Sequence, residues 1–219
     1  MDAPKKYKYR LIFSKGKQVK YVGHLDTVIT WTRAFRRAKI PLAYSEGFNP
    51  QARIQVAISL PVGHMGKAEL MDIFLKEPIQ PGALFSTVNA TLPRGFCLNS
   101  VAEIDPKSPS MQKHLIQANY NVLTETALDE AELTSRIESL LAAEEYMHSR
   151  IRRKKKEIFN LRPMVNQLHL RQVKDGDAQF NMRLSAGHKG NLRPESVLEV
   201  LGLQDNWFEI ERAGLIFDI

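Results

Sequence analysis

Two successive segments of this chain show the same order of strand and helix patterns, β-α-β-β-α-β. Strands are expected where apolar residues alternate, and helices where apolar residues recur every three or four positions. The first segment has these patterns at residues 7–13, 24–38, 54–60, 70–75, 82–92 and 95–101. The second has them at residues 116–122, 128–144, 158–170, 180–184, 193–201 and 208–217. We therefore predict an α+β protein of two tandem ferredoxin-like domains, each with two helices on one face of its sheet.

A polar segment at residues 105–110 separates the two patterns. It contains two prolines and two serines and little that is apolar, which is typical of a linker. We therefore place a basic ferredoxin-like domain at residues 1–105 and a second ferredoxin-like domain at residues 112–219.

Local signals predict details inside these domains. The expected core face of the helix over residues 24–38 consists of Leu25, Val28, Ile29 and Phe35. Thr126 and Asp129 resemble a capping pair at the start of the helix near residue 128. Cys97 lies between two apolar residues, which favours a buried position in a strand.

The charge of the chain is concentrated in its first half. The net charge is +7, and residues 1–110 hold 16 Lys and Arg against 8 Asp and Glu, whereas residues 111–219 hold 15 against 16. Six of the seven residues from Arg150 to Lys156 are also basic. A basic domain with one further basic run favours a polyanion such as nucleic acid as partner. A solvated charge run is the plain alternative for the short segment.

Several functional classes lack their sequence signals. No apolar run reaches the ~18 residues that a membrane helix needs, and the first residues contain no signal-peptide core. With Cys97 as the single cysteine, the chain forms no internal disulfide and holds no iron–sulfur cluster by itself. There is no P-loop and no complete dinucleotide fingerprint. The sequence thus predicts a cytoplasmic protein without membrane partner, cofactor or metal.

The segment Pro41–Pro50 is the strongest candidate for a functional loop. It places two aromatic residues among small and polar ones, directly after an arginine-rich helix end. Arginines bind phosphates, and exposed aromatic rings stack on bases. The predicted nucleic-acid contacts are Lys15, Lys17, Arg33, Arg36, Arg37, Tyr44, Phe48, Asn49 and Arg53. A second predicted patch consists of Arg152, Arg153, Lys154, Lys155 and Lys156.

Two further groups of residues have functional and structural interpretations. The candidate functional loop also includes His24, Asp26, Ser45, Glu46, Gly47 and Pro50. His24 with the nearby carboxylates of Glu69 and Asp72 suggests acid–base chemistry, but a histidine at a helix start is usually structural, so no catalytic residue is assigned. Residues 187–194 combine glycines and cations before a helix, which indicates either an anion site or a tight turn.

An ordered series of motifs in the chain resembles the radical-SAM-associated protein family, a family of unknown function. In the first half the matching motifs are residues 9–16, Gly23-His24-Leu25-Asp26, the arginines of residues 33–37, Pro41–Pro50, Leu60-Pro61-Val62-Gly63 and Glu69-x-x-Asp72. In the second half they are Leu161-Arg162-Pro163 and Gly190-Asn191-Leu192-Arg193-Pro194. Members often carry His-Pro after Gly-Phe-Asn-Pro, where this chain has Gln51-Ala52. They also often carry a serine after the Pro-x-Gly turn, which is missing here.

The resemblance implies work alongside a radical-SAM enzyme. Together with the charge pattern, it favours a non-catalytic accessory protein that binds RNA or presents an RNA or ribosomal substrate to such an enzyme. One alternative is a protein-interaction module for the radical-SAM enzyme that does not bind RNA. Another is a metal-independent endoribonuclease that uses His24, an analogy from fold alone.

Overall fold

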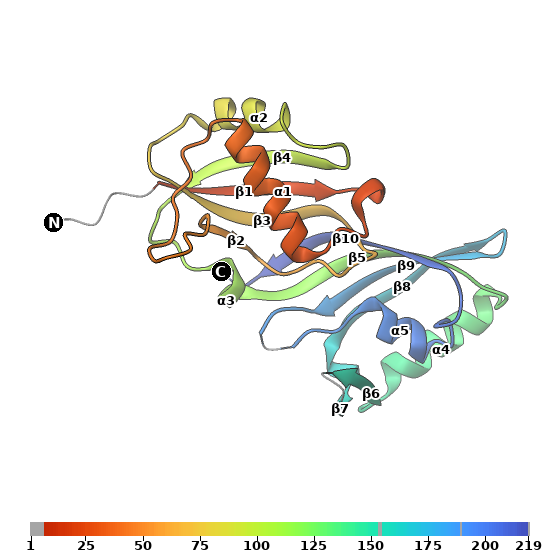
Figure 1. Ribbon diagram of the computed structural model, residues 1–219. Helices are drawn as coiled ribbons and strands as arrows, with labels where there is room; N and C mark the ends of the chain where they lie inside the picture. Colours follow the sequence, from red (N-terminus) through yellow and green to blue (C-terminus); the bar gives the residue numbers. More distant parts are fainter. Residues whose placement is uncertain (1–6, 153–154, 189, 219) are drawn as a thin grey trace. The chain divides into compact units, whose positions relative to one another are not determined.

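The computed structural model of the protein describes residues 7–152, 155–188 and 190–218. The chain divides into two compact units, Met1–His114 (unit 1) and Leu115–Ile219 (unit 2), whose helices and strands are labelled in Figure 1. Each unit combines helices with antiparallel strands, so the predicted α+β class is confirmed. No helix in the described ranges is long and apolar enough to cross a membrane.

Unit 1 is an antiparallel sheet with two main helices. Its elements are β1 (Tyr7–Lys15), η1 (Lys17–Val19), α1 (His24–Arg37), β2 (Ile54–Val56), β3 (Met65–Leu75), α2 (Pro81–Asn89), β4 (Phe96–Ile104) and α3 (Met111–His114). Strands β4, β1 and β3 lie side by side, and β2 pairs with β3. Figure 1 shows α1 crossing the sheet, with α2 beside it.

The core of unit 1 lies between these helices and one face of the sheet. Alternate residues of β1, namely Tyr9, Leu11 and Phe13, are buried there because successive strand side chains point to opposite faces. Trp31 and Phe35 of α1 are fully buried against them. The Trp31 ring lies edge-on to Phe13 with centroids 5.0 Å apart. This aromatic cluster fixes α1, and therefore its exposed side, relative to the sheet.

The buried face of α1 differs from the predicted one. Phe35 is buried as expected, but Leu25 and Ile29 are 75% and 46% exposed, so the prediction for these two residues was wrong. The buried stripe instead passes through Thr27 and Trp31. Apolar residues at helical spacing indicate a face, but only the packing of the helix decides whether that face points inward.

The strands of unit 1 also differ from the predicted ones in three respects. Cys97 is exposed, because in β4 it alternates with the buried side chains of Phe96 and Leu98. The strand expected at residues 54–60 ends at Val56, and β3 begins at Met65 rather than near residue 70.

The predicted linker packs on unit 1. The Lys8 ammonium donates a hydrogen bond to the carbonyl of Ser108 at 3.1 Å. The Lys107 amide donates to a carboxylate oxygen of Asp105 at 2.8 Å, which shapes a turn. The Gln112 side chain, at the start of α3, donates to the carbonyl of Val56 at 2.8 Å. These bonds hold the segment against the unit.

Unit 2 contains four antiparallel strands and a separate hairpin. Its elements are β5 (Leu115–Glu125), α4 (Glu130–Ala142), β6 (Met147–Arg152), β7 (Lys155–Asn160), η2 (Arg162–Met164), β8 (Val165–Lys174), β9 (Asp177–Ser185), α5 (Pro194–Val200) and β10 (Phe208–Phe217). The sheet order is β10-β5-β9-β8, and β6 pairs with β7 outside it. Apolar residues of α4 and α5, including Leu133, Ile137 and Leu198, are buried.

The strand predicted at residues 158–170 was wrong, because the structure divides it into β7 and β8. The break lies at η2, where Pro163 cannot donate to a ladder. Here the Arg162 guanidinium donates two hydrogen bonds to the carbonyl of Leu141, at 3.1 and 2.8 Å, and one to the carbonyl of Val165 at 3.1 Å. Arg162 thus joins the last turn of α4 to the start of β8.

The capping residue of α4 is Asp129, and the predicted pairing with Thr126 was wrong. A carboxylate oxygen of Asp129 accepts a hydrogen bond from the backbone amide of Glu132 at 2.8 Å. The hydroxyl of Thr126 instead accepts from the amide of Leu128 at 3.0 Å, in the turn before the helix. Thr126 therefore stabilises the turn before α4, and Asp129 stabilises the first turn of the helix itself.

Candidate functional site

The predicted loop of unit 1 rises from the edge of its sheet. Its two stems are joined by an isolated bridge between Tyr44 and Ala52. The amide of Ser45 donates to the carbonyl of Gln51 at 2.8 Å, and the amide of Gln51 donates to the hydroxyl of Ser45 at 2.9 Å. Below this neck, the Ala43 amide donates to a β3 carbonyl at 2.7 Å. A closed neck on a sheet gives residues 45–51, the tip loop, a fixed base.

The tip loop presents its side chains to solvent. Phe48 is 106% exposed, and Glu46, Asn49 and Pro50 are exposed as well. Gly47 has φ +119°, a backbone angle that side chains rarely allow. Tyr44 is different, because its side chain is half-buried and packs against the core. Of the two predicted aromatic contacts, the structure therefore exposes Phe48 fully and uses Tyr44 largely as an anchor.

The arginines of α1 line its exposed C-terminal half. Arg33, Arg36 and Arg37 are all exposed. Arg37 donates a hydrogen bond to the carbonyl of Thr91 at 2.7 Å, which ties the helix end to the segment after α2. Arg33 and Arg36, three residues apart, share one side of the helix. Unlike Arg37, Arg33 and Arg36 form no hydrogen bond or ion pair among the described residues.

Lys15 does not belong to the exposed surface, and its prediction as a nucleic-acid contact was wrong. Its side chain is 2% exposed, and its ammonium donates to the carbonyls of Lys20 and Val22 at 3.1 and 2.7 Å. A lysine that is buried and hydrogen-bonded in this way stabilises the turn before α1. Lys17, in η1, is exposed.

Arg53 is partly buried beside the loop stem. Its guanidinium carbon lies 4.9 Å from the centroid of the Phe74 ring, a cation–π geometry. Its backbone amide donates to the carbonyl of Ala43 at 2.8 Å. Arg53 thus contributes to the base of the tip loop as well as to the positive charge near it.

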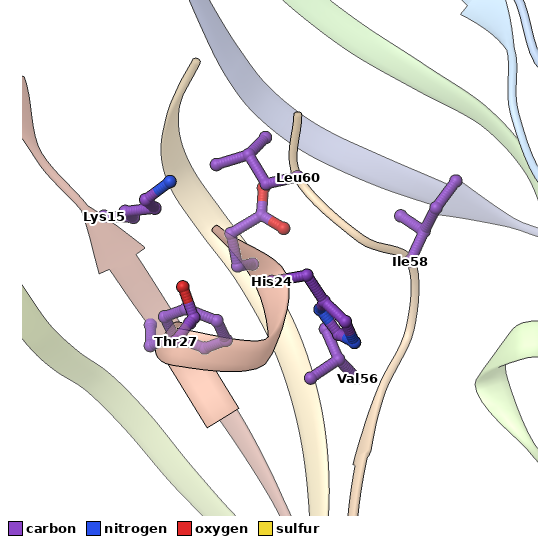
Figure 2. Close-up of a pocket in the computed structure, with 8 residues that line it drawn as sticks. Lys15, His24, Thr27, Val56, Ile58 and Leu60 are labelled. Atoms are coloured by element: carbon purple, nitrogen blue, oxygen red, sulfur yellow. The ribbon is translucent and has the colours of Figure 1, made fainter. Parts of the chain in front are cut away.

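A small cavity in unit 1 brings together three of the polar residues that the sequence singled out. It is lined by Lys15, His24 and Glu69 together with Thr27 and apolar residues. In Figure 2, Lys15 approaches from the β1 side, and His24 lies opposite, beside Val56. The space, about 10 Å³, suits about one water molecule. A cavity of this size gives no support to catalysis by His24.

Asp72 lies away from this cavity. It is buried and pairs with Arg10 through two hydrogen bonds of 2.9 and 3.1 Å, and with the Lys8 ammonium at 3.1 Å. Glu69 and Asp72, three positions apart in β3, lie on opposite faces of the sheet. The two carboxylates that were predicted to lie near His24 are therefore apart, and Asp72 has a structural role. Asp26 is exposed in the first turn of α1, and the described residues contain no metal-binding cluster.

The second basic patch lies on the β6–β7 hairpin. Arg152 and Lys155 are opposite each other in the hairpin ladder, and Lys156 is exposed. Arg153 and Lys154 lie outside the described residues. Arg150, two pairs further along the ladder from Arg152, faces Glu157 and forms an ion pair with it at 3.0 Å.

Two further surface features involve segments with a sequence-based expectation: an anion site or a tight turn at residues 187–194, and a core position for Leu25 and Ile29. The first is a pocket in unit 2, lined by Arg150, residues 187–188, residues 190–191, Arg193 and residues 195–196. The second is a group of exposed apolar side chains in unit 1, called here the apolar patch: Tyr21, Leu25, Ile29 and Val62. The i, i+4 spacing of Leu25 and Ile29 was visible in the sequence, but it was interpreted as core.

The sequence was compared with known protein families. Residues 8–194 match a family described as an uncharacterized protein conserved in bacteria (DUF2344). The chain belongs to this family. The match confirms the prediction of a family of unknown function and covers the tip loop, the α1 arginines and most of the pocket in unit 2. A comparison with curated proteins finds no match.

Several solved structures are similar to this chain at low sequence identity, and one of them has a TM-score above 0.5. A chain of the Cbf5-Nop10-Gar1 complex has a TM-score of 0.55 and 12% identity, covering 95% of this chain and 48% of that one. A chain of an H/ACA RNP bound to a substrate RNA has a TM-score of 0.48 and 12% identity, covering 95% and 47%. A chain of the archaeal box H/ACA sRNP Nop10-Cbf5 complex has a TM-score of 0.47 and 11% identity, covering 94% and 46%. This chain spans about half the length of those structures.

Proposed function

We propose that the protein binds RNA through the tip loop and the exposed arginines of α1 in unit 1. We further propose that it presents an RNA or ribosomal substrate to a radical-SAM enzyme. The observation that carries the RNA proposal is the fully exposed Phe48 on a loop with a hydrogen-bonded neck, in a unit whose α1 exposes Arg33 and Arg36. The sequence resemblance described above supports the radical-SAM partner.

The two kinds of side chain have different tasks in this proposal. Arg33 and Arg36 contact phosphates, which contributes affinity that depends on salt but not on sequence. Phe48 stacks on an unpaired base, and Asn49 beside it has donors and acceptors for a base edge. Such a surface favours single-stranded or looped RNA, since bases inside a helix are not open to stacking.

The proposed domains follow the strand order of each unit. Both units have the sequence β-α-β-β-α-β once the β6–β7 hairpin and the short helices η1, α3 and η2 are set aside. In each unit the first strand of this series lies between the third and the fourth. We propose that the units are two ferredoxin-like domains. On this basis the face of each sheet that its helices leave uncovered is available to a partner.

The salt dependence of RNA binding tests the proposal. Protein freed of nucleic acid is titrated with single-stranded and structured RNA over a salt series, and the Arg33→Gln/Arg36→Gln variant is compared with Lys67→Gln/Lys76→Gln. The control removes the same charge from exposed lysines of unit 1. We expect the arginine variant to reduce the slope of log affinity against log salt by about 1.4, or 0.7 for each contact. Equal slopes for the two variants contradict the proposal.

A protein interface is the second candidate function, and the apolar patch favours it. Leu25 and Ile29 are one helical turn apart on the exposed side of α1, and Gly23 places the backbone close to Val62. An interface formed by this patch predicts that Leu25→Asp weakens capture of a radical-SAM enzyme while RNA binding is retained. If Leu25→Asp also abolishes RNA binding, the apolar patch and the RNA-binding surface are not separate.

A further inference from the structure

The pocket of unit 2 is formed by two segments that are far apart in the sequence. One is the β6–β7 hairpin, which contributes Arg150. The other consists of residues 187–188, 190–191 and 193, together with Glu195 and Ser196 in the first turn of α5. The guanidinium of Arg150 donates from Nη1 to the carbonyl of Asn191 at 3.2 Å and joins the two segments. The pocket has a volume of about 720 Å³, within the range of about 300–1,000 Å³ that small-molecule sites occupy.

The guanidinium of Arg150 is held in one orientation. Its Nε donates to Glu157 at 3.0 Å, and its carbon lies 4.6 Å from the centroid of the Phe159 ring. These contacts and the bond to Asn191 use Nε and Nη1, and Nη2 makes no hydrogen bond within the part of the chain that the structure describes. An arginine fixed in this way loses little side-chain freedom on binding, which favours recognition of a phosphate group.

The segment that begins at Gly187 contributes a second cation to the pocket, and its backbone lies close to that of β5. Arg193 is exposed at the pocket. Gly187 has φ +103°, and a Cβ atom there would clash with the carbonyl oxygen of Leu115, so only glycine allows this path. Asn191 and Ser196 contribute an amide and a hydroxyl to the lining. Glu195 is the acidic residue of the lining, and carboxylates accept hydrogen bonds from sugar hydroxyls and base amino groups.

We propose that this pocket binds a nucleotide unit, with Arg150 and Arg193 on its phosphate and Glu195 on its sugar or base. The unit is either a free mononucleotide or the 5′-phosphorylated end of an RNA, which share this chemistry. The site consists of residues other than those of the RNA surface in unit 1. Its test therefore does not depend on that proposal.

Titration calorimetry tests the pocket with the full chain. The probes are the four nucleoside 5′-monophosphates, the corresponding nucleosides, and a trinucleotide RNA with and without a 5′-phosphate. We expect at least one phosphorylated probe to bind saturably and at least tenfold more tightly than its counterpart without phosphate. Tighter binding of a mononucleotide identifies a free ligand. An RNA end is identified if the trinucleotide binds more tightly with its 5′-phosphate than without it and loses this difference in the Arg193→Gln variant.

Variants connect that binding to the pocket. Arg193→Gln removes an exposed cation of the lining, and Arg171→Gln removes an equally exposed arginine of β8 that does not line the pocket. We expect Arg193→Gln to weaken binding at least tenfold and Arg171→Gln to change it less than twofold. The proposal is overturned if no phosphorylated probe binds up to millimolar concentration, or if both variants bind like the unchanged protein.

Discussion

Ser45 and Gln51 close the neck of the tip loop through a reciprocal pair of hydrogen bonds, 2.8 Å from the Ser45 amide to the Gln51 carbonyl and 2.9 Å from the Gln51 amide to the Ser45 hydroxyl. The pair isolates a short loop whose backbone is held at both ends. Because Phe48 lies within it, a fully exposed aromatic ring has a defined base on the sheet. Preorganisation of this kind lowers the entropy cost of binding.

Phe48→Ala tests whether that ring contacts RNA. We expect the affinity for single-stranded RNA to fall by about 1–3 kcal/mol, since a stacked base contributes this much. Thermal stability should stay unchanged, because the ring makes no buried contact. Phe85→Ala is the matched control, as Phe85 is an exposed phenylalanine of α2 in the same unit. Equal RNA affinities for the two variants would exclude stacking by Phe48.

Asp72→Asn tests the buried ion pairs of unit 1. The neutral amide leaves Lys8 and Arg10 without their counter-charge, and Lys8 is almost fully buried. Breaking a buried pair by removing one partner costs about 3–5 kcal/mol of unfolding free energy. Urea denaturation measures the loss, with the exposed Asp26→Asn as control. A loss below about 1 kcal/mol would show that Asp72 is dispensable for stability.

Asp129→Ala tests the N-cap of α4. The substitution leaves the Glu132 amide without its acceptor, and we expect unit 2 to lose about 1 kcal/mol of stability. Glu130→Ala, one position later, keeps the cap and removes one of the acidic residues of the first turn. Chemical denaturation followed by the fluorescence of Trp207 compares the variants. If Glu130→Ala is the more damaging change, the capping assignment fails.

Gly187→Ala tests the tight path of the pocket loop. The variant combines an unfavourable φ with a clash against the carbonyl of Leu115, so we expect a loss of more than about 3 kcal/mol. Gly176→Ala provides the comparison, because Gly176 has φ +83° with no atom within 4 Å of the added Cβ. It should cost about 1–2 kcal/mol from backbone strain alone. Similar losses for both variants would mean that the close approach to Leu115 is relieved by a small shift.

The sequence determined the order of most elements, because alternation and helical spacing are local properties of the chain. The last strand was predicted at residues 208–217 and is observed as Phe208–Phe217. Local patterns failed where burial depends on the partner. The pattern around Cys97 did not show which face of β4 meets the core, and Lys15 resembled a surface cation until its carbonyl partners in the turn before α1 were known.

Only the tertiary structure decided which distant residues form a site. Arg150 and Asn191 are 41 positions apart, and the sequence placed them in two unrelated segments. Glu69 and Asp72 are only three positions apart, but their side chains lie on opposite faces of the sheet because successive strand residues alternate between the faces. Spacing along a chain constrains neighbours within one helix or strand. Contacts between elements depend on strand pairing and side-chain packing, which bring together residues that no local pattern connects.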